Sequence, residues 1–250
     1  MERDQDKLHL ALPDGHLMAH VLPFVTGAGL RFVGYEKGDL SRRPRLQPES
    51  ERARALIKNP ERVAVKVIRP QDMPMHVANA NFDLAVSGTD WLMEHKLRFP
   101  TSPVTAQRKM GFGKVRIVAA VHQDHGETLG DYIASFRAGI RDKYIKIASE
   151  YVYIADAYAQ KNNLYPYRII MTYGATESLI PEDCDMIIEN TETGNTLRKN
   201  NLRIIDTLEI LGSHESEGCL IVSKKSLETG WKRELIEGID TLFAEYLQNR

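Results

Sequence analysis

Cysteine is scarce in this sequence, with only Cys184 and Cys219 among 250 residues. Two cysteines cannot build a disulfide scaffold in a chain of this length, which favours a reduced, cytoplasmic protein. Both lie among apolar neighbours, so we expect inert core residues and not nucleophiles.

Long hydrophobic runs are also missing. No stretch approaches the ~20 apolar residues that cross a bilayer, and the N-terminus is charged where a signal peptide is apolar. We expect no membrane segment.

Neither sign of charge is in excess. The 33 Lys and Arg residues nearly balance the 34 Asp and Glu residues, which gives a net charge of −1. A nucleic-acid-binding domain usually carries a basic stripe or a high pI, so no nucleic-acid partner is expected. An anionic ligand must be held by a local site, since no general basic field attracts it. The hydrophobic content of 42% and the charged content of 27% are typical of a globular protein. The length of 250 residues is enough for one large α/β domain or two small lobes.

Several catalytic motifs are absent. No HExxH or CxxC pattern, and no His/Cys pair at ligand spacing, supports a structural or catalytic metal site held by the protein alone. No GxSxG pattern supports a nucleophilic serine, and no GxxxxGK[ST] pattern supports a Walker A loop. Metalloproteases, serine hydrolases and P-loop nucleotidases are therefore not expected.

Short apolar runs alternate with longer amphipathic stretches, and this succession predicts an α/β fold with mixed, mostly parallel sheets. The run at 115–121 is the richest in β-branched residues, and we expect it to be a central strand. The predicted strands span 8–12, 31–35, 63–68, 84–87, 115–121, 144–147, 168–171, 186–188 and part of 208–222. The predicted helices span 16–28, 74–80, 129–138, 154–161 and 232–247.

The chain is predicted to leave one lobe and return to it. Residues 99–113 mix Pro, Gly and polar residues before a strong strand, and strand-like sequence resumes at 208–222. We therefore expect a discontinuous first lobe over 1–105 plus 206–250, a second lobe over 106–205, and a cleft between them. Clefts of this kind are favoured ligand sites. The polar, Arg-rich segment 34–61 is interpreted as a solvated surface loop in preference to a phosphate-contacting one.

The strongest local pattern is DMIIENTETGNTLRKNNL at 185–202. A short strand leads into acids and hydroxyls, then into Gly194 and a helix expected to start at Leu197. Gly194 allows a tight turn and a close ligand approach, and amides at a helix N-terminus favour a phosphate. Thr193 and Thr196 add hydroxyl donors, and the carboxylates upstream suit ribose hydroxyls or a ligand's Mg²⁺. From the spacing alone, an anion cradle and an ordinary capped helix are equally good interpretations.

Three other clusters follow predicted strands, where ligands bind in open α/β sheets. In the first, LALPDGHL at 10–17, helix capping by His16 is favoured over ligand contact. In the second, VIRPQDMPMHVANANFDLAVSGTDWLMEH at 67–94, Asp72 is a candidate N-cap, and Arg69 is equally a phosphate contact or a surface charge. Its residues expected beyond the strand end are Ser87, Gly88, Thr89 and Asp90. The third is the turn before Glu177.

Taken in order, these motifs resemble the ATP phosphoribosyltransferase family, which opens histidine biosynthesis. The resemblance rests on LALPDGHL, on the 67–94 motif, on GFGKVRIVAAV and on YGATESLIPEDCDMIIENTETGNTLRKNNLRIID. It implies two α/β lobes like a type II periplasmic binding protein. It also implies a Mg²⁺-dependent transfer of the phosphoribosyl group of phosphoribosyl diphosphate (PRPP) to N1 of ATP, with release of pyrophosphate.

The resemblance also implies the site residues, and it assigns no acid or base. PRPP would bind Glu189, Glu192, Thr193, Gly194, Asn195, Thr196 and Leu197. ATP would bind Asp14, Gly15, His16, Arg69, Asp72, Ser87, Gly88 and Asp90. The substrate would carry Mg²⁺, with Glu189 as a candidate protein ligand.

Three departures from the family pattern matter. Many members have a basic residue in the first turn, where this chain has Asp14 and His16, and the PRPP loop usually has Asp where Glu189 stands. The long form's C-terminal regulatory domain is not in this sequence. We expect either a short form working with a histidyl-tRNA-synthetase-like regulatory subunit or an uncoupled or truncated long form, and in both cases a dimer or higher homo-oligomer. The alternatives are a non-catalytic small-anion-binding or regulatory module and a phosphoribosyltransferase for another nucleotide.

Overall fold

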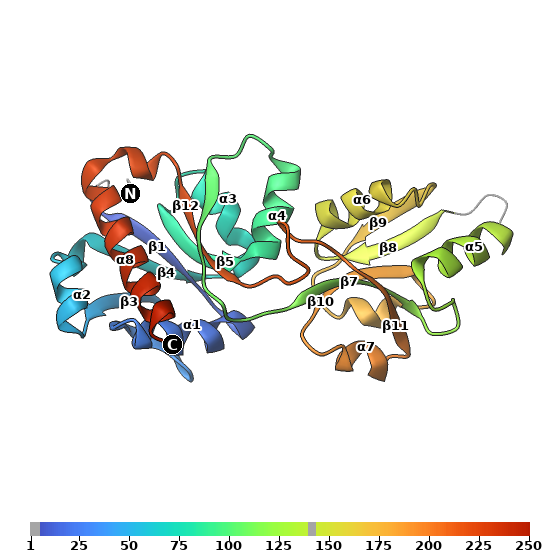
Figure 1. Cartoon of the computed structure of the whole chain (residues 1–250), viewed down its shortest axis with the longest axis horizontal. Helices are drawn as coiled ribbons and strands as arrows, with labels where there is room; N and C mark the ends of the chain where they lie inside the picture. Colours follow the sequence, from blue (N-terminus) through green and yellow to red (C-terminus); the bar gives the residue numbers. More distant parts are fainter. Residues whose placement is uncertain (1–5, 140–143) are drawn as a thin grey trace. The chain divides into compact units, whose positions relative to one another are not determined.

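A computed structural model describes residues 6–139 and 144–250. The chain divides into two compact units, and the first contains both N-terminal and C-terminal segments (Figure 1). The first unit comprises Met1–Leu92, Thr101–Gly113 and Glu217–Arg250, and the second comprises Met93–Pro100 and Lys114–Ser216. Each unit has its own sheet.

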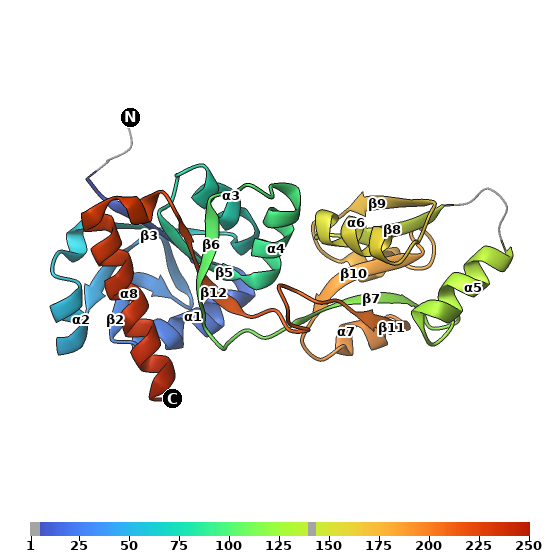
Figure 2. The same ribbon diagram turned by 45° about the horizontal axis from the view of Figure 1, so that its top comes forward.

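The first unit is built on a seven-stranded sheet with the order β2-β3-β4-β1-β5-β12-β6. Side chains alternate between its two faces, as the twofold period of a strand requires. Leu10 and Leu12 belong to the core beneath α1, α2 and α8, whereas Ala11 packs with α3 (Figure 2). The strands are β1 (Leu8–Pro13), β2 (Leu30–Glu36), β3 (Asp39–Pro48), β4 (Val63–Ile68), β5 (Leu84–Gly88), β6 (Val104–Lys109) and β12 (Gly218–Ser223). The helices are α1 (Gly15–Gly27), α2 (Glu51–Leu56), α3 (Met73–Ala78), α4 (Thr89–Arg98), which runs on into the second unit, and α8 (Gly230–Gln248).

The second unit is built on a five-stranded sheet with the order β11-β7-β10-β8-β9. Its core includes apolar residues of β7, β8 and β10 together with Leu197 and Leu202. The strands are β7 (Arg116–His122), β8 (Ile145–Ser149), β9 (Tyr167–Met171), β10 (Met186–Thr191) and β11 (Leu202–Thr207). The helices are α5 (Leu129–Gly139), α6 (Val152–Lys161) and α7 (Asn195–Lys199).

The α/β class and the mixed sheets are confirmed, but the prediction of mostly parallel pairing is wrong. The parallel pairs among the described strands are β1/β4, β1/β5, β10/β8 and β8/β9, and the other six pairs are antiparallel. Antiparallel pairing arises because β2 and β3 form a hairpin and because β12 returns between β5 and β6. Strand β7 is interior but not central, since β10 occupies the middle of its sheet.

Two segment predictions also need correction. The polar stretch 34–61, interpreted as a surface loop, contains strand β3 and helix α2. Pairing with β2 satisfies the backbone of β3 although most of its side chains are exposed, so it carries little hydrophobic periodicity. Of the strand-like stretch 208–222, residues up to Glu217 lie outside the named strands and only β12 joins a sheet.

The predicted lobe boundaries lie too early in the chain. Strand β6 pairs with β12 in the first sheet, so the first unit continues to Gly113 and not to residue 105. Strand β11 pairs with β7 in the second sheet, so the second unit continues to Ser216 and not to residue 205. In both cases hydrogen bonding to a distant strand keeps the segment in its sheet.

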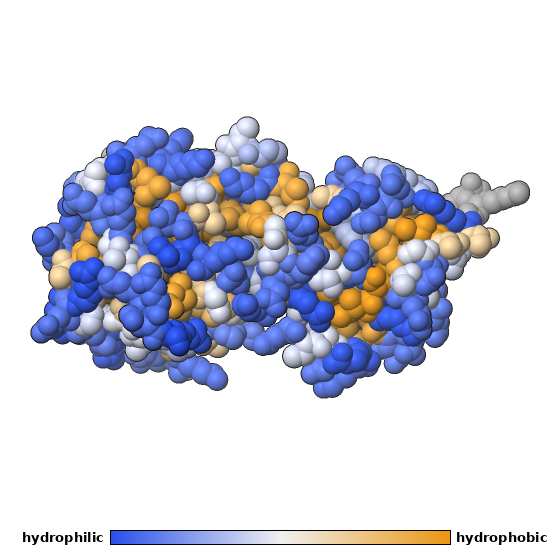
Figure 3. Space-filling model, in the orientation of Figure 1, coloured by the Kyte–Doolittle hydropathy of each residue, from blue (hydrophilic) through white to orange (hydrophobic). Residues whose placement is uncertain are grey.

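The surface and the cores agree with the composition. Hydrophilic residues dominate the face shown in Figure 3, where hydrophobic residues gather in smaller groups. Cys184 and Cys219 are buried free thiols, and burial raises the pKa of each, as expected for core residues. No helix within the described residues is long and apolar enough to cross a membrane.

Candidate active site

The predicted anion cradle forms a strand–loop–helix turn in the second unit. Strand β10 runs between β7 and β8, which fixes the point where the loop at 192–194 begins. The Thr191 hydroxyl accepts a hydrogen bond from the backbone N–H of Gly194 at 2.8 Å. Gly194 has φ +73°, a left-handed conformation in which glycine is favoured. Helix α7 then begins at Asn195, two residues before the predicted start, because Gly194 occupies the N-cap position.

The side chains of this loop divide by exposure. Thr193, Asn195 and Thr196 are exposed, whereas Gly194 is buried. Leu197 is 3% exposed and packs into the core, so only its backbone can face a ligand. Arg198, which the sequence analysis did not select, donates to the Thr193 carbonyl at 3.1 Å and holds the loop closed. The exposed hydroxyls and amides therefore sit on a buried, hydrogen-bonded support.

Glu189 lies on β10 just before this loop. Its carboxylate accepts hydrogen bonds from the backbone N–H of Asn190 at 2.9 Å and from the Asn190 side-chain amide at 3.1 Å. Burial, together with the negative charges of Glu150 and Glu177, raises the pKa of Glu189 to about 7. Glu192 is exposed. A carboxyl with a pKa near neutrality at the end of a strand is typical of a functional site.

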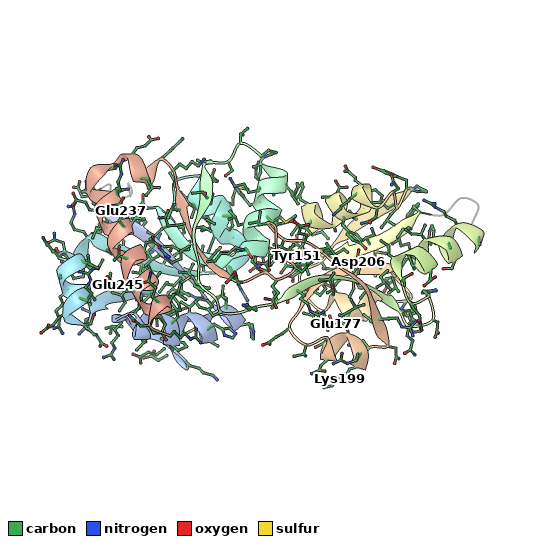
Figure 4. The ribbon with its side chains drawn as sticks, in the orientation of Figure 1. Tyr151, Glu177, Lys199, Asp206, Glu237 and Glu245 are labelled. Carbon is green, nitrogen blue, oxygen red and sulfur yellow. The ribbon has the colours of Figure 1, made fainter. Side chains whose placement is uncertain are left out.

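Two further acids belong to the same edge of the second sheet. Glu150 directly follows β8, and Glu177 lies in the short 3₁₀ turn Thr176–Leu179 after β9 (Figure 4). Because β8, β9 and β10 are parallel neighbours, the segments that follow them meet at one sheet edge. The sequence placed Glu177 after a strand but assigned it no role, and it gave no indication of Glu150. Only the strand order brings these carboxylates together.

In the first unit the predicted nucleotide residues also share one edge. Strands β4, β1 and β5 are parallel neighbours, and they end at Ile68, Pro13 and Gly88. All eight predicted ATP contacts lie at or just after these ends. Ser87 and Gly88 are the last two residues of β5, and the others follow a strand: Asp14, Gly15, His16, Arg69, Asp72 and Asp90. Ligands bind outside the carboxyl ends of strands in such sheets.

Asp14 is a buried carboxylate of this edge, only 7% exposed, and one of its two oxygens has no hydrogen-bond partner. Arg42 donates to its Oδ2 at 2.7 Å, and the Nε of Arg69 lies 3.7 Å from its Oδ1, which has no hydrogen-bond partner. Arg42 comes from β3, in the segment interpreted as a solvated loop, so the sequence analysis missed it. The Arg42 guanidinium therefore lies beside Asp14, which stands in the turn where many family members have a basic residue.

The expected capping role of His16 is wrong. Asp14 occupies the N-cap position of α1 and makes no side-chain cap bond, because its carboxylate binds Arg42 instead. Gly15 adopts φ +66°, which carries the chain from β1 into the helix. His16 is exposed in the first turn of α1, with its Nε2 atom 3.4 Å from the Nε2 atom of His20.

The other predicted nucleotide residues differ in accessibility. Ser87 is fully buried and donates its hydroxyl to the Pro70 carbonyl at 2.9 Å, so it supports the turn. Asp90 is 5% exposed and accepts from the Trp91 backbone N–H at 2.9 Å. A Cβ on Gly88 would lie 2.1 Å from Asp90 Oδ1, so any larger residue would force the Asp90 carboxylate to move. Asp72 and Arg69 are exposed, and Asp72 holds the predicted N-cap position of α3 without a side-chain cap bond.

A resident metal centre built by the protein alone does not fit these residues. The described part of the chain holds no group of three or more His, Cys, Asp or Glu side chains arranged to bind a metal ion. One carboxylate combined with the phosphates of a substrate is, however, a common way to hold Mg²⁺.

Comparisons with known proteins decide the family. The HisG family model, described as ATP phosphoribosyltransferase, matches residues 69–245. The chain belongs to this family. The ATP phosphoribosyltransferase of Chlorobaculum parvum is 32% identical over 243 residues, which cover 97% of this chain and 72% of that one. The enzyme of the same name from Geotalea daltonii is 33% identical over 183 residues, and that match spans 73% of this chain but only 58% of the relative.

Solved structures confirm the predicted fold. The ATP phosphoribosyl transferase (HisG:HisZ) complex from Thermotoga maritima matches with a TM-score of 0.68 at 21% identity, over 96% of this chain and 100% of that chain. The Candida albicans CA3427 gene product, described as having the generic periplasmic binding protein fold, matches with a TM-score of 0.55 at 9% identity, over 97% and 71%. At these identities the likeness concerns the fold.

Proposed function

We propose that this chain is an ATP phosphoribosyltransferase, which transfers the phosphoribosyl group of PRPP to N1 of ATP and releases pyrophosphate. This is the first step of histidine biosynthesis. The observation that carries the proposal is the 189–197 segment: in a chain of this family, it combines exposed hydroxyl and amide donors with an adjacent carboxyl whose pKa lies near neutrality.

In this proposal the second unit binds PRPP. The 5′-phosphate would lie on the loop from Thr193 to Leu197 and take hydrogen bonds from the two threonine hydroxyls and from backbone amides. Helix α7 has only five residues, so the hydroxyls and amides contribute more than its dipole. Glu189 would accept hydrogen bonds from the ribose hydroxyls. The closed, Arg198-bound loop supports this role, since little ordering remains for the ligand to impose.

The first unit would bind ATP along the edge formed after β4, β1 and β5. Arg69 is exposed and offers a guanidinium to the triphosphate, while Gly15 and Gly88 allow close approach of the backbone. Many family members have a basic residue in the turn after β1. In this chain the positive charge at that turn would come from Arg42, which is paired with Asp14. ATP is the proposed nucleotide for this edge.

The chemistry asks little of acid–base residues. Adenine N1 already carries the lone pair that attacks ribose C1, and the bond from C1 to the pyrophosphate oxygen breaks with both electrons leaving on pyrophosphate. The protein must hold N1 and C1 in line and stabilise the departing charge. Mg²⁺, when bound to the substrate's phosphates and to Glu189, would supply charge neutralisation.

We further propose that the chain acts as an oligomer and associates with a histidyl-tRNA-synthetase-like regulatory subunit. The support is the fold likeness to the Thermotoga maritima HisG:HisZ complex. Size-exclusion chromatography with light scattering on the chain alone, and then with a HisZ-type subunit added, tests this association. A complex larger than either component is expected, and two unchanged peaks would contradict it.

The activity is tested by turnover. The chain is incubated with PRPP, Mg²⁺ and either ATP, ADP, AMP or GTP, with and without a HisZ-type subunit, and the products are identified by mass spectrometry. We expect pyrophosphate and N1-(5-phosphoribosyl)-ATP from ATP alone. A phosphoribosylated product from another nucleotide would assign a different substrate. PRPP binding with no product in any mixture would contradict an enzyme and favour an anion-binding module.

A further inference from the structure

We propose that His16 and His20 form a binding site for a transition-metal ion, with Zn²⁺ as the reference ion. The two residues lie four positions apart on helix α1, and this spacing places both imidazoles on one face. Their Nε2 atoms face each other at 3.4 Å. His16 is also one of the predicted ATP contacts, so Zn²⁺ binding is measured without nucleotide and its outcome does not depend on transferase activity.

The separation of the two nitrogens matches that of two ligands on one ion. Zinc–nitrogen bonds are about 2.0–2.1 Å long, and a tetrahedral angle at the metal then places two ligand nitrogens about 3.4 Å apart. The same His-x-x-x-His spacing on a helix supplies two of the zinc ligands in metalloproteases. This pair is neither a His/Cys pair nor part of an HExxH motif, so neither of those sequence patterns includes it.

The rest of the molecule holds one of the two rings in place. The His20 ring stacks on the Phe112 ring, with centroids 6.3 Å apart and planes 7° from parallel. His20 is half-buried, whereas His16 is exposed and accessible to an ion. A fixed ligand lowers the entropic cost of binding.

The chemistry of the pair selects the class of ion. Neutral imidazole suits Zn²⁺, Cu²⁺ and Ni²⁺, whereas Mg²⁺ and Ca²⁺ prefer oxygen ligands. Within the described residues no third His, Cys, Asp or Glu completes the set, so water would fill the other positions. In the metal-free protein the 3.4 Å Nε2–Nε2 contact is a long hydrogen bond in which one nitrogen donates. On metal binding that proton would move from Nε2 to Nδ1 of the same ring, which frees the Nε2 lone pair of each neutral imidazole for the ion.

A second histidine pair provides a matched control. His122 and His125 have ring centroids 6.1 Å apart, and the His122 Nδ1 lies 3.3 Å from Asp124. These residues belong to the second unit and are separated in sequence by three positions. His125→Gln therefore removes one imidazole from an alternative pair by the same chemical change.

The test measures Zn²⁺ binding to untagged protein by competition with a chromophoric chelator. The proteins are the wild type, His16→Gln, His20→Gln and His125→Gln, each first shown to be folded by circular dichroism and thermal unfolding. We expect one bound Zn²⁺ per chain, at least tenfold weaker binding in the first two variants and unchanged binding in the third. No Zn²⁺ binding by the wild type, or wild-type affinity in both His16→Gln and His20→Gln, would overturn the proposal.

A spectroscopic measurement on the wild type guards against variants that fail to fold. Protein labelled with ¹⁵N at histidine is titrated with Zn²⁺ while the ring nitrogen resonances are recorded. The Nε2 resonances of His16 and His20 are expected to shift together with one stoichiometry. Shifts confined to other histidines would contradict the site.

Discussion

At the residue scale, Glu189 and Asp14 are the two carboxyl groups with the most unusual surroundings in the candidate site. Glu189 has a pKa raised to about 7 because burial and two neighbouring acids disfavour its charge. Asp14 is buried and lies beside two guanidinium groups. In the second unit the surroundings of Glu189 therefore disfavour its charged form. In the first unit the Asp14 carboxylate has a cation, Arg42, within hydrogen-bonding distance.

Replacing Glu189 with Gln should stabilise the protein at high pH. In the unfolded chain this carboxyl loses its proton near pH 4.5, whereas the folded protein holds the proton up to about pH 7. The folded state thus binds more protons, so its stability falls as pH rises through this interval. We expect Glu189→Gln to have a free energy of unfolding about 1–3 kcal/mol above the wild type at pH 8 and equal to it at pH 4.

Urea unfolding at both pH values measures this difference. Glu192→Gln is the control, since Glu192 is an exposed acid three residues along the same segment. A difference between Glu189→Gln and the wild type that does not change with pH would contradict the raised pKa.

Removing Arg42 should destabilise the first unit through Asp14. The Arg42→Ala variant leaves a buried carboxylate without its 2.7 Å partner, and an unsatisfied buried charge costs about 1–3 kcal/mol. Arg43→Ala is the matched control, because Arg43 is an exposed arginine at the next position. Chemical unfolding of both variants measures the cost, and the double variant Asp14→Asn/Arg42→Ala should recover part of it. Equal stability of the two single variants would refute the role of Arg42.

At the element scale, the buried carboxylate of Asp83 connects helix α8 to the sheet. It lies at the starts of the strands, opposite the candidate ATP-binding edge. Asp83, just before β5, accepts from Lys232 Nζ at 2.8 Å, from the Ser226 hydroxyl at 2.7 Å and from the His9 backbone N–H at 2.7 Å. One carboxylate thereby connects the starts of β1 and β5 with the start of α8. The other ends of β1 and β5 belong to the candidate ATP-binding edge, so this carboxylate fixes two of its three strands.

We expect Lys232→Met to lower the free energy of unfolding by about 1–3 kcal/mol, since it leaves a charge on Asp83 that is only 4% exposed. Lys225→Met is the control, because Lys225 is exposed and lies just before the same helix. Guanidinium unfolding, with the slope checked to be unchanged, provides the comparison. A loss in Lys225→Met as large as that in Lys232→Met would show that Asp83 is not the cause.

The elements were predictable from the sequence where they carry strong periodicity. Strands β1, β4 and β5 and helices α1, α3, α6 and α8 appear within a few residues of their predicted positions. Strand β3 was missed because most of its side chains are exposed and its order comes from backbone pairing with β2. Arg42 was missed for the same reason, since its contact with Asp14 exists only once β3 joins the sheet.

At the scale of the whole molecule, the strand order in each sheet creates the candidate sites. In the first unit the ends of β4, β1 and β5 meet, and in the second unit the ends of β8, β9 and β10 meet. The motifs after these strands were visible in the sequence, and the family resemblance that they carry is confirmed by the family model. The grouping of Glu150, Glu177 and Glu189 was not predictable, because it depends on which strands become neighbours.

The central claim is that the second unit binds PRPP through the loop around Gly194, and calorimetric titration with PRPP and Mg²⁺ tests it most directly. We expect saturable binding by the wild type. Gly194→Ala should weaken binding at least tenfold, because φ is +73° and a side chain at this position strains the backbone of the loop. Gly230→Ala, where a Cβ meets nothing within 4 Å, should bind as the wild type does. The absence of PRPP binding by folded wild-type protein, or unchanged binding by Gly194→Ala, would contradict the claim.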